Sequence, residues 1–546
     1  MTTPVWFRSI AGLIGPGRLA RWLSHATPSQ APQTTKPTGR KTFSQARLYS
    51  GSAPTRLTYD WITSTSSADA ELVRGLRALR NRSRSLVRDN GHAKRARAVI
   101  QANVIGPGIG LQATLTNNRG RLVDTVNDDI EAAWADWCRA RHCHIGGRLH
   151  FADLERLLMG EVFEAGEAII RIHRRAPGGG RIPLCLEVIE AERLADEYEI
   201  PVIDGNLVRQ GVEVDRYHRP VAYWIHTIHP GDPRKDLGGI DRIERVPADQ
   251  IIHLAIIERW PQTRGVPWMH AAIDTLRQLG EYEEAAVVAA RIGASKVGFF
   301  TNPDGDLAPL ADGDENGTPS ATVEAGEFAS LPPGYDFKSW DPNYPTENYD
   351  DFTRNLLRGI AAAVGVSYES LTRDYSQSNY SSSRLALLED RDLWRHLQSW
   401  FIRGFREELH RVWLEAAVLS GAVPALPVSA YAANPERYQA AARWKPRGWG
   451  WVDPAKEVNA YKEAERAGYI TKADIISATG NGRDLEDVLK ARRRELDLLA
   501  ALDLETDTTH PQDAPGETDP TMPDEDDEDA APAAGRILAF GKRDHD

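Results

Sequence analysis

The sequence predicts an α+β protein, and three stretches of it carry the prediction. Residues 109–257 mix short β-branched runs with amphipathic helical stretches, which is typical of a mixed α/β domain. Residues 381–420 place apolar side chains mostly three and four positions apart without a proline, which predicts one long helix. Residues 431–502 are largely helical, with a helix start at Asp453 and a stop at Gly468.

Length and composition indicate a folded protein of two or more domains. The chain has 546 residues, 41% of them hydrophobic, and its 15 tryptophans allow a substantial core. The formal net charge of −12 argues against a protein that coats itself in nucleic acid, because phosphate neutralisation needs clustered Lys and Arg. The three cysteines give no disulfide framework and suit a reducing cytoplasm. No apolar run approaches the roughly 20 residues of a membrane span, and glycines interrupt the apolar N-terminus, which makes a poor signal peptide.

The two ends of the chain have opposite charge. Residues 1–57 contain basic but no acidic residues, with Pro, Ser, Thr and Gln between them, and we expect a disordered arm. This arm could touch DNA, a scaffold or a shell protein, or it could be a solvated tail. Residues 504–546 are acidic and Pro-rich, with DEDDED at 524–529, and predict a disordered acidic tail.

The first predicted helix spans residues 68–89, and a second spans residues 92–104. Leucines follow one side of the first helix. A neighbouring stripe carries four arginines, namely Arg77, Arg80, Arg84 and Arg88. This stripe could contact DNA phosphate or an acidic neighbouring subunit, and the acidic balance of the chain favours pairing between subunits.

Two helices and five strands are expected between residues 109 and 257. The helices cover 126–139 and 151–162. The strands cover 168–173, 184–189, 211–215, 221–228 and 250–254.

A group of thiols and imidazoles in this region invites a zinc interpretation. Its members are Cys138, His142, Cys143, His144 and His150. Their spacing matches no standard pair of ligand pairs, and the chain has no second Cys pair to complete a site. We therefore predict no metal ion.

A second group could carry acid–base chemistry and would suit a hydrolase or nuclease that acts on DNA. It consists of Glu161, Glu164, Glu167 and His173, but glutamates that flank a strand more often form a solvated face. The chain contains no GxxxxGK[ST] phosphate-binding loop, no HExxH and no GxSxG. The sequence therefore predicts no enzymatic activity, no catalytic residue and no cofactor.

The segment from residue 268 to residue 383 alternates helices with polar stretches. Helices are expected over 268–295 and 348–364, with strand-like pieces at 297–301 and 324–331 between them. Residues 367–383 then form a serine-rich loop, which cannot contribute a core and should face solvent. A polar loop between two rigid helices can present its side chains to a passing partner.

Many segments in a fixed order carry a family resemblance. They include RNRSRSLVRDNGHAKRARAVIQANVIGPGIGLQA, GVEVDRYHRPVAYWIHTIHP and IAAAVGVSYESLTRDYSQSNYSSSRLALLE. Over residues 57–502 the chain resembles the portal proteins of lambda-like tailed bacteriophages. No single motif is decisive, and the specificity lies in the order of the segments.

The resemblance implies a mixed α/β wing domain, long stem helices, a small clip subdomain, an α-helical crown and a ring oligomer. The wing would cover 58–266 and the long wing helix 384–430. The remaining parts would be a stem helix (267–295), the clip (296–345), a second stem helix (346–366), the tunnel loop (367–383) and the crown (431–503).

The resemblance also implies a structural, non-enzymatic channel of about twelve copies at one capsid vertex. DNA would enter through it during packaging and leave through it on ejection. The terminase large subunit would dock on the clip, and major capsid, scaffold and head-completion (connector) proteins would be further partners. The protein would belong to the virion, after assembly in the host cytoplasm, with no membrane partner.

Within the tunnel loop, six residues would meet the double-stranded DNA: Arg373, Asp374, Tyr375, Ser376, Gln377 and Ser378. Their contact would be weak, because a strong phosphate clamp repeated around a ring would stall translocation. A soluble scaffold or adaptor that binds a partner through the acidic tail is an alternative function.

Overall fold

The computed structural model describes most of the chain between residues 65 and 502. The described residues are Arg56 and residues 65–197, 205–233, 242–294, 298–301, 336–339, 349–450, 454–479 and 485–502. The chain divides into two units, Met1–Thr65 and Ser66–Asp546, and every element below belongs to the second. The predicted basic arm apart from Arg56, the predicted strand 324–331 and the predicted acidic tail lie outside the described residues.

Helices α3 (Ala68–Asp89) and α4 (Gly91–Val104) form where the sequence predicts them. The Ser67 hydroxyl accepts a hydrogen bond from the Ala70 amide and caps α3. Asn90 separates the two helices, and its side chain accepts hydrogen bonds from two amides of the first turn of α4. One polar residue therefore ends the first helix and starts the second.

A three-stranded antiparallel sheet has the order β3–β2–β8. Its strands are β2 (Glu167–His173), β3 (Cys185–Ile189) and β8 (Ile251–Ala255). Strand β2 is the central strand, and Ile169 lies opposite Ile189 on one side and His253 on the other. All three strands lie within two residues of their predicted positions.

A four-stranded antiparallel sheet has the order β4–β5–β6–β7. Its strands are β4 (Leu207–Arg209), β5 (Val212–Val214), β6 (Pro220–His226) and β7 (Ile243–Pro247). The sequence predicts β5 and β6 but misses the other two. Strand β4 has only three residues, and four of the five residues of β7 are exposed, so neither shows an apolar alternation.

Helices α5 (Asp124–Trp137) and α7 (Phe151–Ala165) confirm the two helices predicted in this region. Their buried aromatic side chains pack with those of the long C-terminal helix, and the ring centroids of Trp134 and Trp413 lie 4.8 Å apart. Strand β1 (Gly110–Ala113) pairs with β11 (Ala442–Lys445), which joins segments more than 300 residues apart in sequence. These contacts build one large core.

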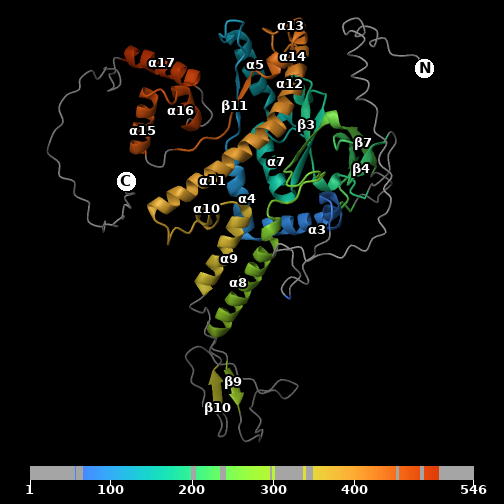
Figure 1. Cartoon of the computed structure of the whole chain (residues 1–546), viewed down its shortest axis with the longest axis vertical. Helices are drawn as coiled ribbons and strands as arrows, with labels where there is room; N and C mark the ends of the chain where they lie inside the picture. The colour runs from blue at the N-terminus through green and yellow to red at the C-terminus, as the bar shows by residue number, and fades with distance from the viewer. Residues whose placement is uncertain are drawn as a thin grey trace, which may run out of the picture. The chain divides into compact units, whose positions relative to one another are not determined.

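Helices α8 (Ile273–Ala294) and α9 (Tyr349–Val364) lie beside each other (Figure 1). The rings of Tyr282 and Tyr349 stack with centroids 5.6 Å apart. In the sequence between these two helices, β9 (Gly298–Thr301) pairs antiparallel with β10 (Asp336–Ser339). The sequence predicts β9 but not β10.

The predicted polar loop 367–383 is wrong over part of its length, because residues Tyr368–Thr372 form the short helix α10 and Tyr380 already begins α11. Leu371 of α10 is only 1% exposed. A single buried leucine among polar residues gives no helical period, which explains the error.

The long helix is confirmed as α11 (Tyr380–Phe401), a π-helical turn (Ile402–Glu407) and α12 (Glu408–Leu419). Its predicted apolar face is only partly buried. The buried members are Trp394, Leu397, Phe401, Phe405, Leu409 and Val412. The face extends too far at both ends, since Leu385, Leu388 and Leu419 are exposed.

The C-terminal region is helical, as predicted. Helices α13 (Val428–Ala433) and α14 (Pro435–Gln439) precede β11. Helices α15 (Pro454–Arg466), α16 (Lys472–Thr479) and α17 (Leu485–Ala501) follow it. None of the helices in the described part of the chain is long and apolar enough to span a bilayer.

Candidate nucleic-acid interface

Helix α10 holds the base of the predicted DNA-contact segment, residues 373–378, in a fixed position. Asp390 of α11 is 5% exposed, and its carboxylate accepts hydrogen bonds from the Ser367 amide at 2.8 Å and the Ser367 hydroxyl at 2.7 Å. The same carboxylate accepts a bond of 2.6 Å from the Ser370 hydroxyl. These bonds attach the start of α10 to the long helix.

The segment itself starts in a left-handed conformation. Arg373 has φ 62° and ends α10, where its amide donates to the Glu369 carbonyl at 2.8 Å. Asp374 accepts hydrogen bonds from the Ser376 amide at 3.0 Å and the Tyr368 hydroxyl at 2.8 Å. Hydrogen bonds from Ser376 and then Tyr368 lower the pKa of Asp374 to about 2. Asp374 is therefore anionic at neutral pH and serves the turn.

The six predicted residues divide into two kinds. Arg373, Tyr375, Ser376 and Gln377 are exposed, and the Tyr375 side chain is 59% exposed. Asp374 and Ser378 are half-buried, and the Ser378 hydroxyl donates to the Tyr375 carbonyl at 3.1 Å. The exposed four are available to a partner, and their contact with DNA stays a prediction.

Two arginines that the sequence analysis missed lie beside α10. Arg95 of α4 donates from Nε to the Ser370 carbonyl at 3.2 Å. Burial and then the charge of Arg373 lower the pKa of Arg95. Arg358 of α9 is exposed, with its guanidinium 5.7 Å from the Tyr368 ring centre. Arg95 lies 275 positions before Ser370, so no local sequence signal could reveal its contact with α10.

The predicted arginine stripe on α3 does not form one surface. Arg80 is 1% exposed and pairs with Glu167, while Arg84 pairs with Glu161 and Glu192 at 2.9 Å each. Burial removes Arg80 from any external surface, whereas Arg84 is 27% exposed and already pairs with carboxylates of its own chain. A contact of the remaining stripe with DNA or a neighbouring subunit stays a prediction.

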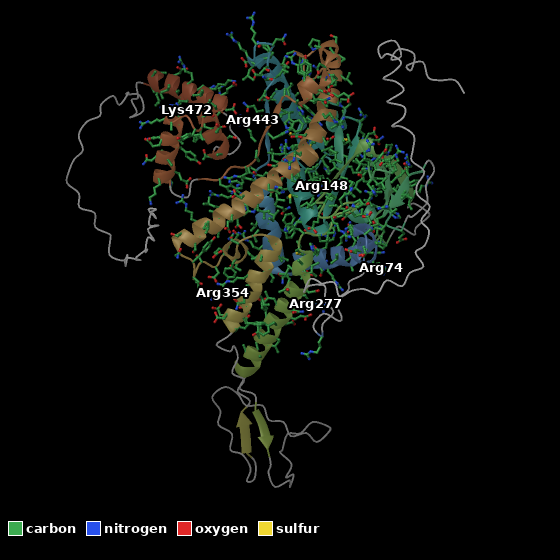
Figure 2. All side chains as sticks on the ribbon, viewed as in Figure 1. Arg74, Arg148, Arg277, Arg354, Arg443 and Lys472 are labelled. Atoms are coloured by element: carbon green, nitrogen blue, oxygen red, sulfur yellow. The ribbon has the colours of Figure 1, made fainter. Side chains whose placement is uncertain are left out.

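The other two arginines of the stripe remain exposed. Arg77 lies 3.9 Å from Glu197, and Arg88 pairs with its neighbour Asp89 at 2.9 Å. Arg74, one turn earlier on the same helix, is exposed too (Figure 2). Arg77 and Arg88 are thus the exposed members of the predicted stripe.

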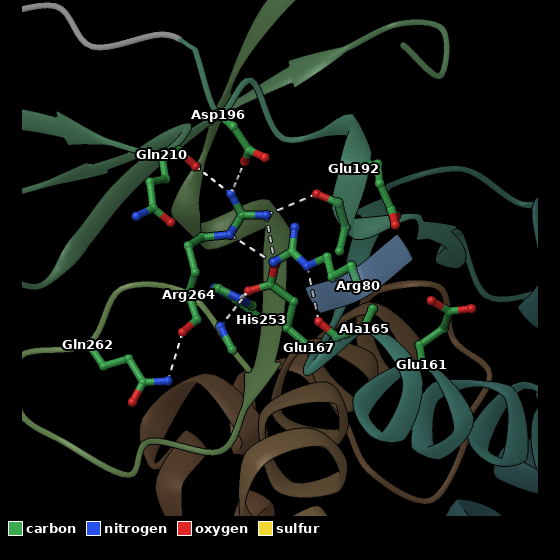
Figure 3. Close-up of polar contacts among 12 residues, drawn as sticks. Arg80, Glu161, Ala165, Glu167, Glu192, Asp196, Gln210, His253, Gln262 and Arg264 are labelled. Carbon is green, nitrogen blue, oxygen red and sulfur yellow. Dashed lines mark hydrogen bonds and ion pairs between the residues drawn. The ribbon is translucent and has the colours of Figure 1, made fainter. Parts of the chain in front are cut away.

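Glu167 lies at the centre of a buried ion network (Figure 3). Its carboxylate is fully buried and accepts hydrogen bonds from Arg80, from Arg264 Nε at 2.8 Å and from His253 Nε2 at 2.9 Å. The Gly265 amide donates a further bond of 2.9 Å. Burial alone would raise the pKa of Glu167, but Arg264, Arg80 and His253 hold this pKa well below its usual range.

Arg264 extends the network to the four-stranded sheet. Its side chain is fully buried and donates to the Ala191 carbonyl at 2.9 Å and the Gln210 carbonyl at 2.6 Å. It also pairs with Asp196. The network therefore connects α3, the two sheets and the segment after β8.

This arrangement overturns the expectation of a solvated glutamate face. Glu167 is fully buried, and Glu164 is 9% exposed and pairs with Arg97 at 2.8 Å. His173 bonds to Glu187 at 2.7 Å instead of joining the three glutamates. Glu161 and Glu164 share Arg84, at 2.9 Å and 4.0 Å, while Glu167 and His173 have other partners, so the four residues do not converge on one site.

The thiols and imidazoles of the considered zinc site make local contacts. The Cys143 thiol is fully buried beside the Cys138 carbonyl, and burial raises the pKa of Cys143 to about 12. His142 Nδ1 lies 2.9 Å from the Asp136 carbonyl, and His150 Nδ1 accepts from the Ala152 amide at the start of α7. In the part of the chain that the structure describes, no three His, Cys, Asp or Glu side chains are arranged to hold a metal ion.

Residues 55–398 match the family described as phage portal proteins of the lambda family, which is more than half of the chain. The chain therefore belongs to the lambda family of phage portal proteins. A probable portal protein of Halomonas phage phiHAP-1 is 31% identical over 518 residues, which cover 93% of this chain and 96% of the relative.

Two further relatives are more distant. The portal protein of Escherichia phage N15 is 23% identical over 468 residues, with 80% of this chain and 87% of the relative covered. Portal protein B of Escherichia phage lambda is 21% identical over 479 residues, with 80% and 86% covered.

Solved structures with a similar chain come from gene transfer agent (GTA) particles. A chain in the virion of the native particle is 16% identical, with a TM-score of 0.35 and coverage of 76% of this chain and 94% of that chain. A chain in the neck of the native particle, computed with C12 symmetry, is 17% identical, with a TM-score of 0.37 and coverage of 73% and 93%. The family assignment rests on the sequence matches.

Proposed function

We propose that copies of this chain assemble into the portal ring of a tailed phage, with about twelve subunits around a channel for double-stranded DNA. Family membership supports the proposal, and so does one structural observation. Helices α8 and α9 pack side by side, the β9–β10 pair lies between them in the chain, and α9 leads directly into α10 and residues 373–378. This order suits a stem that carries a clip at one end and a tunnel loop at the other.

Exposed apolar side chains on the stem helices support the ring. Val287 and Val288 of α8 are 59% and 45% exposed, and Phe352 of α9 is 49% exposed. Covering such side chains lowers the free energy, because apolar surface is removed from water. A closed ring covers the same patch on every copy. We infer that these residues contact the adjacent subunit.

The exposed part of the tunnel loop suits a sliding contact. Arg373 brings one positive charge, and Tyr375, Ser376 and Gln377 bring neutral polar groups. One phosphate contact per subunit binds weakly and depends on salt. Such a loop could follow the duplex without arresting it.

In this proposal the chain acts as a structural component and not as an enzyme. The terminase large subunit would supply the ATP hydrolysis and dock on the clip, residues 296–345. Major capsid and scaffold proteins would surround the ring during assembly in the host cytoplasm, and head-completion proteins would bind it in the virion.

Light scattering combined with negative-stain imaging tests the proposal. Purified protein should give rings of about a dozen subunits with a central hole. A stable dimer with a fixed interface would contradict it, and so would a chain that stays monomeric with its scaffold and capsid proteins present. The double variant Val288→Ser and Phe352→Ser should reduce ring formation, whereas the exposed control Leu419→Ser should not.

A further inference from the structure

Two arginines of α11 lie against the ring of one tryptophan in the segment after β11, and a third arginine lies nearby. The guanidinium carbons of Arg391 and Arg395 lie 5.8 Å and 5.5 Å from the ring centre of Trp449. Arg447 lies close enough for its charge to lower the pKa of Arg391. We call Arg391, Arg395, Arg447 and Trp449 the Trp449 cluster.

Few carboxylates in the described chain balance the positive charge of this cluster. Glu457 of α15 acts on Arg391 through its charge, and it lies 4.0 Å from Arg384 of α11. Arg391 donates to the Gly450 carbonyl at 3.2 Å, and its buried Nε has no partner there. Arg447 donates to the Ala102 carbonyl, which is also uncharged. Only Arg395 has a hydrogen-bonded carboxylate, that of Asp392 at 2.8 Å, and this pair is exposed. Guanidinium groups crowded in this way favour a carboxylate or phosphate ligand.

The pKa of Arg391 is consistent with that crowding. Burial lowers this pKa most, the carboxylate of Glu457 on α15 raises it, and the charges of Arg395 and Arg447 lower it further. An anion bound between the arginines would relieve the repulsion.

We propose that the Trp449 cluster is the docking site for the acidic segment of the chain's own tail, DEDDED at residues 524–529. Residues 503–529 contain twelve acidic and no basic residues, which equals the whole formal net charge of −12. The arginines of the cluster and the acidic tail thus carry opposite charge. The docked tail would keep nucleic acid away from these arginines, and this inference does not depend on the proposed ring.

The tail is attached close to the cluster. Gly448, next to Arg447, lies against the end of α16, because an added Cβ would come within 2.5 Å of the Ala478 carbonyl. Helix α16 contacts α17, and the tail follows α17. A linker of the length of residues 503–523 has a root-mean-square span of about 25 Å, the length of a helix such as α17. The acidic segment can therefore return to the cluster of its own copy at a high effective concentration.

A peptide-binding experiment on the full chain tests this. The six acidic residues of 524–529 are changed to Asn or Gln, and a labelled peptide with the sequence ETDPTMPDEDDEDA is titrated by fluorescence anisotropy at low salt. The neutralised-tail chain should bind the peptide about tenfold more tightly than wild type, because the native tail no longer competes. Adding Arg391→Gln and Arg447→Gln to the neutralised-tail chain should weaken binding about tenfold.

The exposed, ion-paired Arg411 of α12 provides a matched control, and Arg411→Gln should leave peptide affinity unchanged. Unchanged thermal unfolding of the Arg391 and Arg447 variants shows that they fold. Equal peptide affinity with and without Arg391 and Arg447 would overturn the proposal, since the peptide would then bind elsewhere, for instance through the basic residues of 1–57.

Two further outcomes would overturn it. A short DNA duplex that binds the wild-type and neutralised-tail chains equally, through Arg391 and Arg447, would show that the tail does not occupy the cluster. If the wild-type chain binds the peptide more weakly than the neutralised-tail chain only at high protein concentration, the cluster is occupied by the tail of another copy. Tighter duplex binding after tail neutralisation that requires Arg391 and Arg447 would support it.

Discussion

Replacing Glu167 by Gln should strongly destabilise the unit that joins α3 to the two sheets. The substitution keeps the shape of the side chain but removes the only fully buried carboxylate that Arg80 and Arg264 share in the described chain. Both guanidinium groups are at most 1% exposed, so water cannot replace the lost charge. Asp196 still pairs with Arg264, while Arg80 keeps only the Ala165 carbonyl at 3.0 Å. Breaking a buried ion pair from one side costs about 3–5 kcal/mol, and we expect a loss of that size.

Urea unfolding at pH 7, followed by tryptophan fluorescence, measures the loss in the free energy of unfolding. A chain of this size can unfold in more than one transition, so the first transition of the variant is compared with that of wild type. Glu244→Gln is the control, since its pair with Arg171 lies at the surface and should cost less than about 1 kcal/mol. Protonation gives a second check. The depressed pKa of Glu167 stabilises the fold above the unfolded pKa of about 4.3, and this contribution is lost as the pH falls through the folded pKa. Wild type and variant should therefore converge in acid. A Glu167→Gln transition within about 1 kcal/mol of wild type at pH 7 would refute the role of the network.

Three other predictions follow from the core and the loop. Burial and then the charge of Arg406 lower the pKa of His410 to about 4. As the pH falls from about 6.5 to about 4, only the unfolded chain therefore takes up this proton. The free energy of unfolding should drop by about 3 kcal/mol over that window. His410→Phe should remove that part of the pH dependence in urea unfolding at pH 7 and pH 4.5, and an unchanged dependence would contradict the assignment. Asp390→Ala should release α10 from α11 and cost about 2–3 kcal/mol locally, seen as faster hydrogen exchange in residues 368–372, whereas Asp392→Ala should leave that exchange unchanged. The double variant Tyr375→Ala and Gln377→Ala should leave assembly intact but reduce the amount of DNA packaged per particle. Arg119→Ala is the control and should not reduce it. Normal packaging and retention of DNA by the double variant would contradict the tunnel-loop assignment.

Local patterns made much of the fold predictable. The leucine spacing of residues 68–89 predicted α3, and the structure adds Ser67 as the cap at its start. Apolar runs located β2 and β8 because both sides of these strands are largely buried. The errors arise where a local pattern is absent, as in β7, where four of the five residues are exposed and no alternation exists.

The sites were harder to predict because long-range pairing decides them. The arginines of α3 look like one stripe in the sequence. Arg80 is nevertheless buried, because it pairs with Glu167, which lies 87 positions later and also binds Arg264, a further 97 positions on. Nothing in the spacing separates Arg80 from the exposed Arg77. In the same way, the position of α10 depends on Asp390, whose hydrogen bonds reach back about 20 positions to Ser367 and Ser370.

The division of labour within residues 367–378 matters for a channel. Asp390 and Asp374 bind groups of the chain itself, so the base of the segment and its turn keep their positions. The side chains of Arg373, Tyr375 and Gln377 are exposed beyond that base. In the proposed ring each copy would repeat this arrangement, and a contact of only about 1 kcal/mol per subunit would amount to a large barrier if all copies acted together. In that ring, a fixed base with a single cation per loop would keep each contact weak and would hold the loop at a constant distance from the channel axis.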